Sequence, residues 1–132
     1  MTKPSIPGPN EQPSTGAEPV PPGGDVESKA GAEPTREEVN RLRGPVLLEF
    51  GTEWCSYCAA LRPHLRTLLG QFPRVRHIRV EDGKGKPLGR SFHVKLWPTL
   101  VFLRDGEVVR QASRPTPTEV REGLQAIAPE GA

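Results

Sequence analysis

The sequence predicts an α/β domain, in which a mixed sheet of roughly four strands is flanked by helices and preceded by a disordered N-terminal tail. Three observations support this class. Segments with helix and strand spacing alternate along the chain in the order α-β-α-β-α-β-β-α. The run Val46-Leu47-Leu48-Glu49-Phe50 is almost unbroken in apolar character, as expected for a parallel strand covered on both faces. The composition also changes near residue 35, where a Pro- and Gly-rich stretch ends.

The predicted tail has a composition that disfavours folding. Residues 1–34 hold eight of the 16 prolines and five of the 14 glycines, but only seven apolar residues and no aromatic one. Such a segment buries too little apolar surface to offset the entropy lost on ordering. We therefore assign residues 1–34 to a disordered tail and residues 35–132 to one folded domain.

The first elements of the domain follow from local signals. Thr35-Arg36-Glu37-Glu38 has the form of a capping box and predicts a short helix that ends before Gly44-Pro45. After the strand at 46–50, apolar residues at 58, 61, 65, 68 and 69 predict a helix over 55–69, closed by Gly70. Pro63 lies inside this helix and is expected to kink it.

The second half of the domain predicts three more strands and two helices. In chain order these are a strand at 75–80, a short helix at 87–92, strands at 99–103 and 108–112, and an amphipathic helix at 118–128. Asp105-Gly106 is a typical hairpin turn between the last two strands. We expect Thr118 to open the final helix as its N-cap.

Charge and hydropathy exclude some functions. The chain of 132 residues has 18 Lys and Arg against 16 Asp and Glu, a net charge of +2 that does not indicate a nucleic-acid partner. No run of 18 apolar residues predicts a membrane span, and the N-terminus lacks the pattern of a secretory signal. We therefore expect a cytoplasmic protein without a membrane or nucleic-acid partner, and a monomer.

The chemically distinctive segment is Trp54-Cys55-Ser56-Tyr57-Cys58, between the first strand and the following helix. Cys55 is predicted at a helix N-terminus, a setting that favours a thiolate and can lower the pKa of a thiol from about 8.5 to roughly 3.5–7.5. Cys58 lies about one turn further on, so the two sulfurs share a face and can form a disulfide. The alternatives are half of a zinc site and two inert buried thiols. The only histidines, His64, His77 and His93, lack the spacing of structural zinc ligands.

This motif and its surroundings resemble the thioredoxin family over about residues 45–128. The family has a Trp-Cys-x-x-Cys turn between a buried strand and a helix, with an acid in that strand, a proline within the helix and a cis-proline followed by threonine. The matching positions are Glu49, Pro63 and Pro98-Thr99. The resemblance implies a thioredoxin-like fold and thiol-disulfide exchange, in which Cys55 attacks and Cys58 resolves the mixed disulfide. It implies no cofactor beyond the Cys55-Cys58 disulfide, and a partner reductase as electron donor.

Several positions depart from the family pattern. Ser56-Tyr57 stands between the cysteines, where thioredoxins usually have Gly-Pro, and Gly51 replaces an aromatic residue. The usual first strand is not evident, and the family's substrate-contacting glycine after the last strand is replaced within Ser113-Arg114-Pro115. Glutaredoxins also have a Gly-Gly pair after the cis-proline strand that helps to hold glutathione, and this sequence has none at that place. We therefore expect no glutathione site.

The remaining candidate residues concern proton transfer and docking. Glu49 is the only charge in its buried strand, and burial raises a carboxyl pKa, which suits proton exchange with Cys58. The alternative is a structural ion pair with an arginine. We expect Trp54 and Trp97 to form a docking surface beside Pro98, and we expect His64 and His77 to be surface or packing residues. The predicted substrate-binding residues are Trp54, Ser56, Tyr57, Trp97, Pro98 and Thr99.

Together these features predict a thiol-disulfide oxidoreductase acting on protein disulfides through the pair Cys55 and Cys58. A non-catalytic module that uses the same surface to bind proteins is the alternative.

Overall fold

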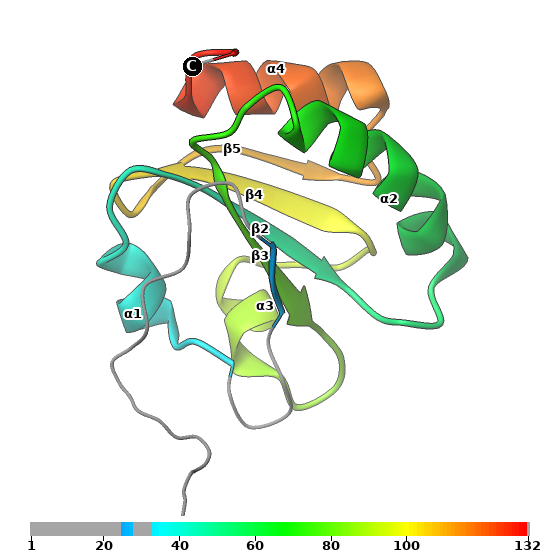
Figure 1. Ribbon diagram of the computed structural model, residues 1–132. Coiled ribbons are helices and arrows are strands. Elements are labelled where there is room, and N and C mark those ends of the chain that lie inside the picture. Colours follow the sequence, from blue (N-terminus) through cyan, green and yellow to red (C-terminus); the bar gives the residue numbers. More distant parts are fainter. Residues whose placement is uncertain (1–24, 28–32, 132) are drawn as a thin grey trace, which may run out of the picture.

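The computed structural model describes residues 25–27 and 33–131 and has a central sheet covered by helices on both faces (Figure 1). The sheet contains five strands in the order β1-β3-β2-β4-β5. The strands are β1 (Asp25–Glu27), β2 (Pro45–Gly51), β3 (Arg76–Glu81), β4 (Thr99–Arg104) and β5 (Glu107–Ser113). The helices are α1 (Arg36–Asn40), α2 (Ser56–Leu69), α3 (Pro87–Ser91) and α4 (Pro117–Ile127).

The sheet is mixed. β3 pairs parallel with both β1 and β2, whereas β4 pairs antiparallel with β2 and β5. The β4–β5 turn has Asp105 and Gly106 at φ 52° and 82°, the left-handed geometry of a two-residue hairpin. The predicted mixed α/β sheet flanked by helices is therefore confirmed.

Alternation along β2 divides the core into two layers. Leu47 faces α2 and α4 together with Leu100 and Phe102 of β4. Val46, Leu48 and Phe50 face the other side, where Val39 of α1 and Leu88 of α3 pack against them. Since side chains alternate along a strand, Glu49 lies on the α2 side with Leu47, at the end of β2 that precedes the cysteines.

Two details differ from the sequence-based expectation. The four predicted strands correspond to β2 to β5, and β1 adds a short fifth strand at the β3 edge, where none was predicted. The last helix begins two residues earlier than expected: Thr116 is its N-cap, because its hydroxyl accepts a hydrogen bond from the Glu119 backbone N–H at 3.1 Å. Most of the predicted disordered tail, residues 1–34, lies outside the described residues.

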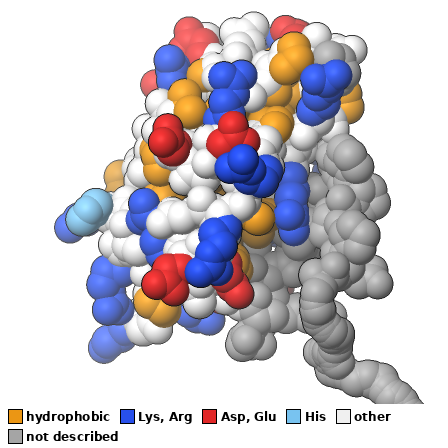
Figure 2. All heavy atoms as spheres, turned by 90° about the vertical axis from the view of Figure 1, so that its left-hand side faces the viewer, with side chains coloured by type: hydrophobic (Ala, Val, Ile, Leu, Met, Phe, Trp, Pro, Cys, Tyr) orange, Lys and Arg blue, Asp and Glu red, His pale blue; other side chains and the backbone are white. Residues whose placement is uncertain are grey.

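The surface carries charges of both signs. On the face shown in Figure 2, Lys and Arg side chains are interspersed with Asp and Glu. In the described part of the chain, no helix is long and apolar enough to cross a membrane.

Candidate active site

Cys55 occupies the junction between β2 and α2. It is the N-cap of α2, with φ −79° and ψ 117°, and its Sγ accepts a hydrogen bond from the Cys58 backbone N–H at 3.2 Å. The predicted helix start is thus shifted by one residue, so that the sulfur takes the place of the usual capping oxygen. Negative charge on Sγ is favoured in this position, because it faces the positive end of the helix dipole.

Cys58 lies one turn into α2, and both cysteines are free thiols with little exposure. Burial raises the pKa of the Cys58 thiol to about 11, and its hydrogen bond with Cys55 acts in the same direction. Gly51 leaves the space that this sulfur occupies, because a Cβ on residue 51 would lie 2.6 Å from Cys58 Sγ. At neutral pH, therefore, Cys58 is protonated and needs a base before it can act as a nucleophile.

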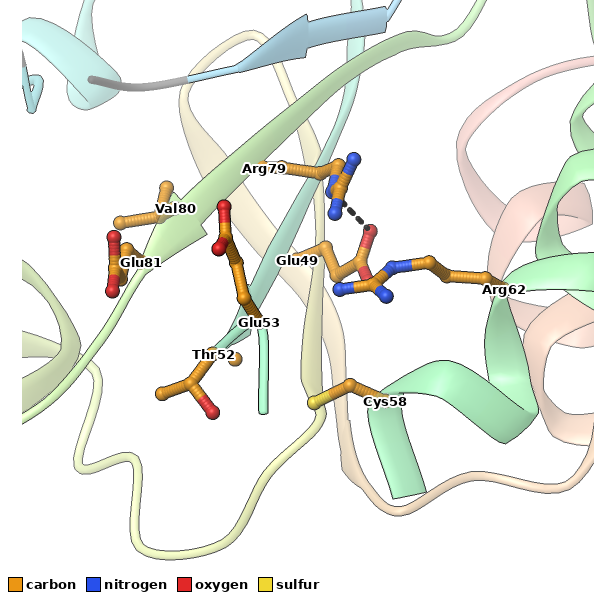
Figure 3. A pocket seen from close by; sticks show the side chains of 9 residues that line it. Glu49, Thr52, Glu53, Cys58, Arg62, Arg79, Val80 and Glu81 are labelled. Atoms are coloured by element: carbon orange, nitrogen blue, oxygen red, sulfur yellow. Dashed lines mark ion pairs between the residues drawn. The ribbon is translucent and has the colours of Figure 1, made fainter. Parts of the chain in front are cut away.

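A small cavity of about 60 Å³ connects Cys58 with the acid of β2 (Figure 3). It is large enough to hold ordered water, and polar groups line much of it. Its lining residues are Glu49, Gly51, Thr52, Glu53, Cys58, Arg62, Arg79, Val80 and Glu81. The Thr52 hydroxyl is buried there and has no hydrogen-bond partner among residues 25–27 and 33–131, which suits contact with water.

Glu49 is held by two residues of β3. His77 Nε2 lies 2.8 Å from Glu49 Oε1, and Arg79 Nε lies 3.9 Å from the same oxygen. The Glu49 and His77 side chains are almost fully buried. Figure 3 shows Arg79, from β3, and Arg62, from α2, pointing toward the Glu49 carboxylate. Glu49 is therefore not an isolated buried acid, and the arginine contact expected under the alternative interpretation is present.

His77 has a contact that the sequence analysis did not foresee. Of the two expected roles, surface or packing, its position fits packing: the ring is buried against Glu49, because Val80 and Ile78 alternate with it and face the opposite layer. The alternation at 75–80 already implied that His77 and Arg79 share a face. Only the pairing of β3 with β2 reveals what that face contacts.

The residues predicted to dock substrates lie around Pro98. The Trp97-Pro98 bond is cis, as the resemblance implied. Trp54 is 77% exposed, and its ring meets that of Trp97 edge-on with 5.5 Å between centroids. Trp97 Nε1 donates to Asp82 Oδ2 at 2.9 Å, which fixes the ring. The two indoles therefore form one aromatic surface beside the cysteines.

The other side of the site is formed by the first turn of α2 and the segment after β5. Ser56 and Tyr57 are exposed, whereas Thr99 is buried and its hydroxyl donates to the Leu96 carbonyl at 2.6 Å. The Arg114 guanidinium lies 3.9 Å from the centroid of the Tyr57 ring. Trp97 thus contacts Trp54, and Pro98 lines a cavity with Tyr57, so these predicted substrate-binding residues meet the segment that holds the cysteines. The Thr99 side chain is buried and contacts the protein itself.

The histidines show no metal-binding arrangement. His64 and His93 are exposed, and His93 has the left-handed φ of 59°. Within residues 25–27 and 33–131, no group of three or more His, Cys, Asp or Glu residues is placed to hold a metal ion.

Comparison with known proteins agrees with this geometry. The model of the thioredoxin family matches residues 28–126, which is more than half of the chain. The protein therefore belongs to the thioredoxin family.

Several individual proteins that are similar to this chain are named thioredoxins. Thioredoxin 2 from Pseudomonas aeruginosa PAO1, solved in its reduced form, is 50% identical, with a TM-score of 0.64 over 70% of this chain and 87% of that one. Mitochondrial thioredoxin-3 from Saccharomyces cerevisiae is 25% identical over 62% of this chain and 65% of its own length. Thioredoxin Asp f 28 from Aspergillus fumigatus is 31% identical over 48% of this chain and 59% of its own length. The match spans less than two thirds of both curated relatives.

Proposed function

We propose that the protein is a thiol-disulfide oxidoreductase that exchanges disulfides with protein substrates through Cys55 and Cys58. The observation that carries this proposal is the unequal environment of the two sulfurs. Cys55 Sγ accepts a backbone N–H at the N-terminus of α2, whereas burial keeps the neighbouring Cys58 protonated. Such an arrangement favours one sulfur for attack and holds the other until it is needed.

In the proposed reaction, the Cys55 thiolate attacks one sulfur of a substrate disulfide, and the other substrate sulfur leaves as a thiolate. Cys58 then loses its proton and attacks Cys55 Sγ, which forms the Cys55-Cys58 disulfide and releases the second substrate thiol. Two electrons pass from the protein to the substrate. A partner reductase restores the dithiol, and the mechanism needs no cofactor beyond the cysteine pair.

Glu49 is the proposed acceptor of the Cys58 proton. Both groups line the small cavity, and a thiol with a pKa of about 11 needs such a base near neutral pH. The contact with His77 positions the carboxylate, since it fixes Oε1 at 2.8 Å from a buried ring nitrogen. Arg79 Nε, 3.9 Å from the same oxygen, places a positive charge beside the carboxyl group of Glu49.

Docking is proposed to use the aromatic surface around Pro98. Trp54 and Tyr57 are large exposed side chains beside the cysteines, and such side chains are common where proteins bind one another. The cytoplasmic location, the monomeric state and the lack of a nucleic-acid or membrane partner remain predictions from the sequence.

Cysteine variants test the assignment. Cys58→Ser is expected to accumulate a mixed disulfide with insulin through Cys55, because the resolving thiol is gone, whereas Cys55→Ser is expected to trap none. Mass spectrometry of the non-reduced product measures this. If both variants trap insulin equally, the nucleophile is misassigned. If the wild type reduces no protein disulfide, the alternative of a non-catalytic binding module is favoured.

A further inference from the structure

Arg114 has an unusual position directly after β5. Its φ is 48°, a left-handed conformation that is uncommon for a long side chain. Its backbone N–H donates to the Pro98 carbonyl at 2.7 Å, and the next residue, Pro115, is buried. The backbone at Arg114 is therefore hydrogen-bonded to the cis-proline, which lines a surface cavity together with Tyr57.

The Arg114 side chain lies across the candidate docking surface. Nε donates to the Trp97 carbonyl at 3.0 Å, and the guanidinium carbon stacks 3.9 Å from the Tyr57 ring centroid. The cation thus contacts one residue beside the cis-proline and one residue between the two cysteines. It is nevertheless exposed to solvent, which makes it available to a bound partner.

The guanidinium retains donors for a ligand. Of its five N–H groups, one is used by the Trp97 carbonyl, and the two Nη atoms make no hydrogen bond to any residue in the described part of the chain. The contacts with Trp97 and Tyr57 hold the planar group in place, so less side-chain freedom is lost when a ligand binds. A carboxylate matches this planar set of donors in shape and charge.

The charge around Arg114 favours the same ligand. A surface cavity of about 230 Å³ adjoins it, between the first turns of α2 and α4. The residues that line this cavity are Tyr57, Ala60, Leu61, His64, Pro98, Arg114, Pro115 and Pro117. They include Arg114 and an exposed histidine but no acidic side chain, whereas Glu53 lines the separate small cavity beside Glu49.

We propose that Arg114 is a specificity-determining residue that favours protein substrates with an Asp or Glu side chain next to the disulfide attacked by Cys55. This inference rests on the proposed oxidoreductase function and adds a substrate class to it. An exposed ion pair of this kind contributes modestly, so a preference of about two- to fivefold in the exchange rate is expected. Because the pair is exposed, added salt weakens the preference.

Three matched peptides test the proposal. Each contains one internal disulfide, and they differ only in having Glu, Gln or Lys on either side of the first cysteine. The reduced protein supplies both electrons, so each turnover converts one peptide disulfide to two thiols and one protein dithiol to a disulfide. Chromatography of the peptide at a single turnover gives the rate. The wild type is expected to reduce the Glu peptide about two- to fivefold faster than the Gln peptide, and the Lys peptide more slowly than both.

Variants of Arg114 then identify the source of the preference. In Arg114→Gln the Glu and Gln peptides should be reduced at the same rate to within about 1.5-fold, and Arg114→Gly, which suits the left-handed φ, should give the same result. Arg104→Gln is the matched control: Arg104 is an exposed arginine at the opposite end of β4, so this variant should keep the wild-type ratio.

Two results would overturn the inference: equal rates for the three peptides in the wild type, or a wild-type ratio that persists in both Arg114 variants. Neither result contradicts the proposed oxidoreductase function. That function is contradicted only if the wild type reduces neither the peptides nor insulin.

Discussion

The buried Cys58 thiol links the chemistry of the site to the stability of the fold. Its pKa is raised by burial from 9.0 to about 11, so between these pH values the unfolded chain has lost a proton that the folded protein keeps. Cys58 therefore contributes fully to the stability of the reduced protein below pH 9. This contribution is lost as the pH rises toward 11, and the unfolding free energy falls by about 2–3 kcal/mol over the whole window.

Urea unfolding of the reduced protein between pH 8 and 11 checks this prediction. Other groups also titrate at these pH values, so the comparison is with reduced Cys58→Ser, which has no thiol at this position. The variant should show a shallower loss of stability than the wild type. Identical pH dependence in the two proteins would show that the raised pKa of Cys58 does not contribute.

Glu49 is the second residue with a testable role. Glu49→Gln retains the shape and a hydrogen-bonding oxygen but removes the proton acceptor, so resolution of the mixed disulfide should slow by about 10²-fold near neutral pH. Attack by Cys55 should change little, because it depends on the helix terminus. The unfolding free energy should fall by about 1–3 kcal/mol, since a charged hydrogen-bond partner of His77 is lost. Rapid quenching of a single turnover separates the two steps.

Two controls separate proton transfer from structural support. Glu81→Gln removes an exposed carboxylate from the same cavity and should affect neither resolution nor stability. His77→Gln disturbs the positioning of Glu49 but keeps its carboxyl group, so it should lower stability and slow resolution less than Glu49→Gln does. Destabilised Glu49→Gln with a normal resolution rate would leave only the structural role.

At the scale of single elements, the N-cap residue determines where α4 begins. α4 begins with a capping box in which the Glu119 carboxylate also accepts the Thr116 N–H at 2.8 Å. Thr116→Ala should therefore cost about 1 kcal/mol of stability. Thr118→Ala, at an exposed position two residues later, should change stability by less than about 0.5 kcal/mol. Thermal unfolding of the two variants compares these values, and a larger loss at Thr118 would contradict the observed cap.

The elements show which features local sequence signals can predict. The apolar run of β2, the hairpin at Asp105-Gly106 and the capping box at Thr35 were all predictable, because each depends on residues that are neighbours in the chain. The start of α4 was predicted at Thr118, although Pro117 favours the first helical position and so indicates Thr116 as the cap.

Only those residues of the candidate site that are neighbours in the sequence could be predicted together. The two cysteines, Trp54 and Tyr57 lie within five residues of one another, so one motif identifies them together. The contact between Glu49 and His77 depends on the register of β2 against β3, and the stacking of Arg114 on Tyr57 depends on how the segment after β5 returns to α2. No local pattern specifies either arrangement.

At the scale of the whole molecule, β1 covers one edge of the sheet. It is only three residues long, and its single valine, between Asp25 and Glu27, gave no strand signal. β1 forms because it pairs with β3. The free edge of β3 would otherwise expose unsatisfied backbone N–H and C=O groups, to which any extended segment can hydrogen-bond. Without β1, β3 would become the edge strand of the sheet. β3 carries the buried apolar side chains of Ile78 and Val80.

Two truncations test what the N-terminal segment contributes. Removal of residues 1–24 keeps β1 and, from the Pro- and Gly-rich composition, should change neither melting temperature nor exchange activity. Removal of residues 1–32 also deletes β1. The hydrogen bonds lost are worth about 0.5–1.5 kcal/mol each, but ordering each strand residue costs about 1–2 kcal/mol, so the net change in stability should stay small.

The larger expected effect of the longer truncation is self-association, because the newly exposed β3 edge can pair with the same edge of another molecule. Sedimentation at increasing protein concentration should therefore show association for the protein lacking residues 1–32 and none for the protein lacking residues 1–24. A fall of several degrees in the melting temperature of the shorter truncation would show instead that residues before β1 pack on the domain. If neither truncation associates or loses stability, β1 is dispensable and the β3 edge is protected by its own charged residues, Arg76 and Arg79.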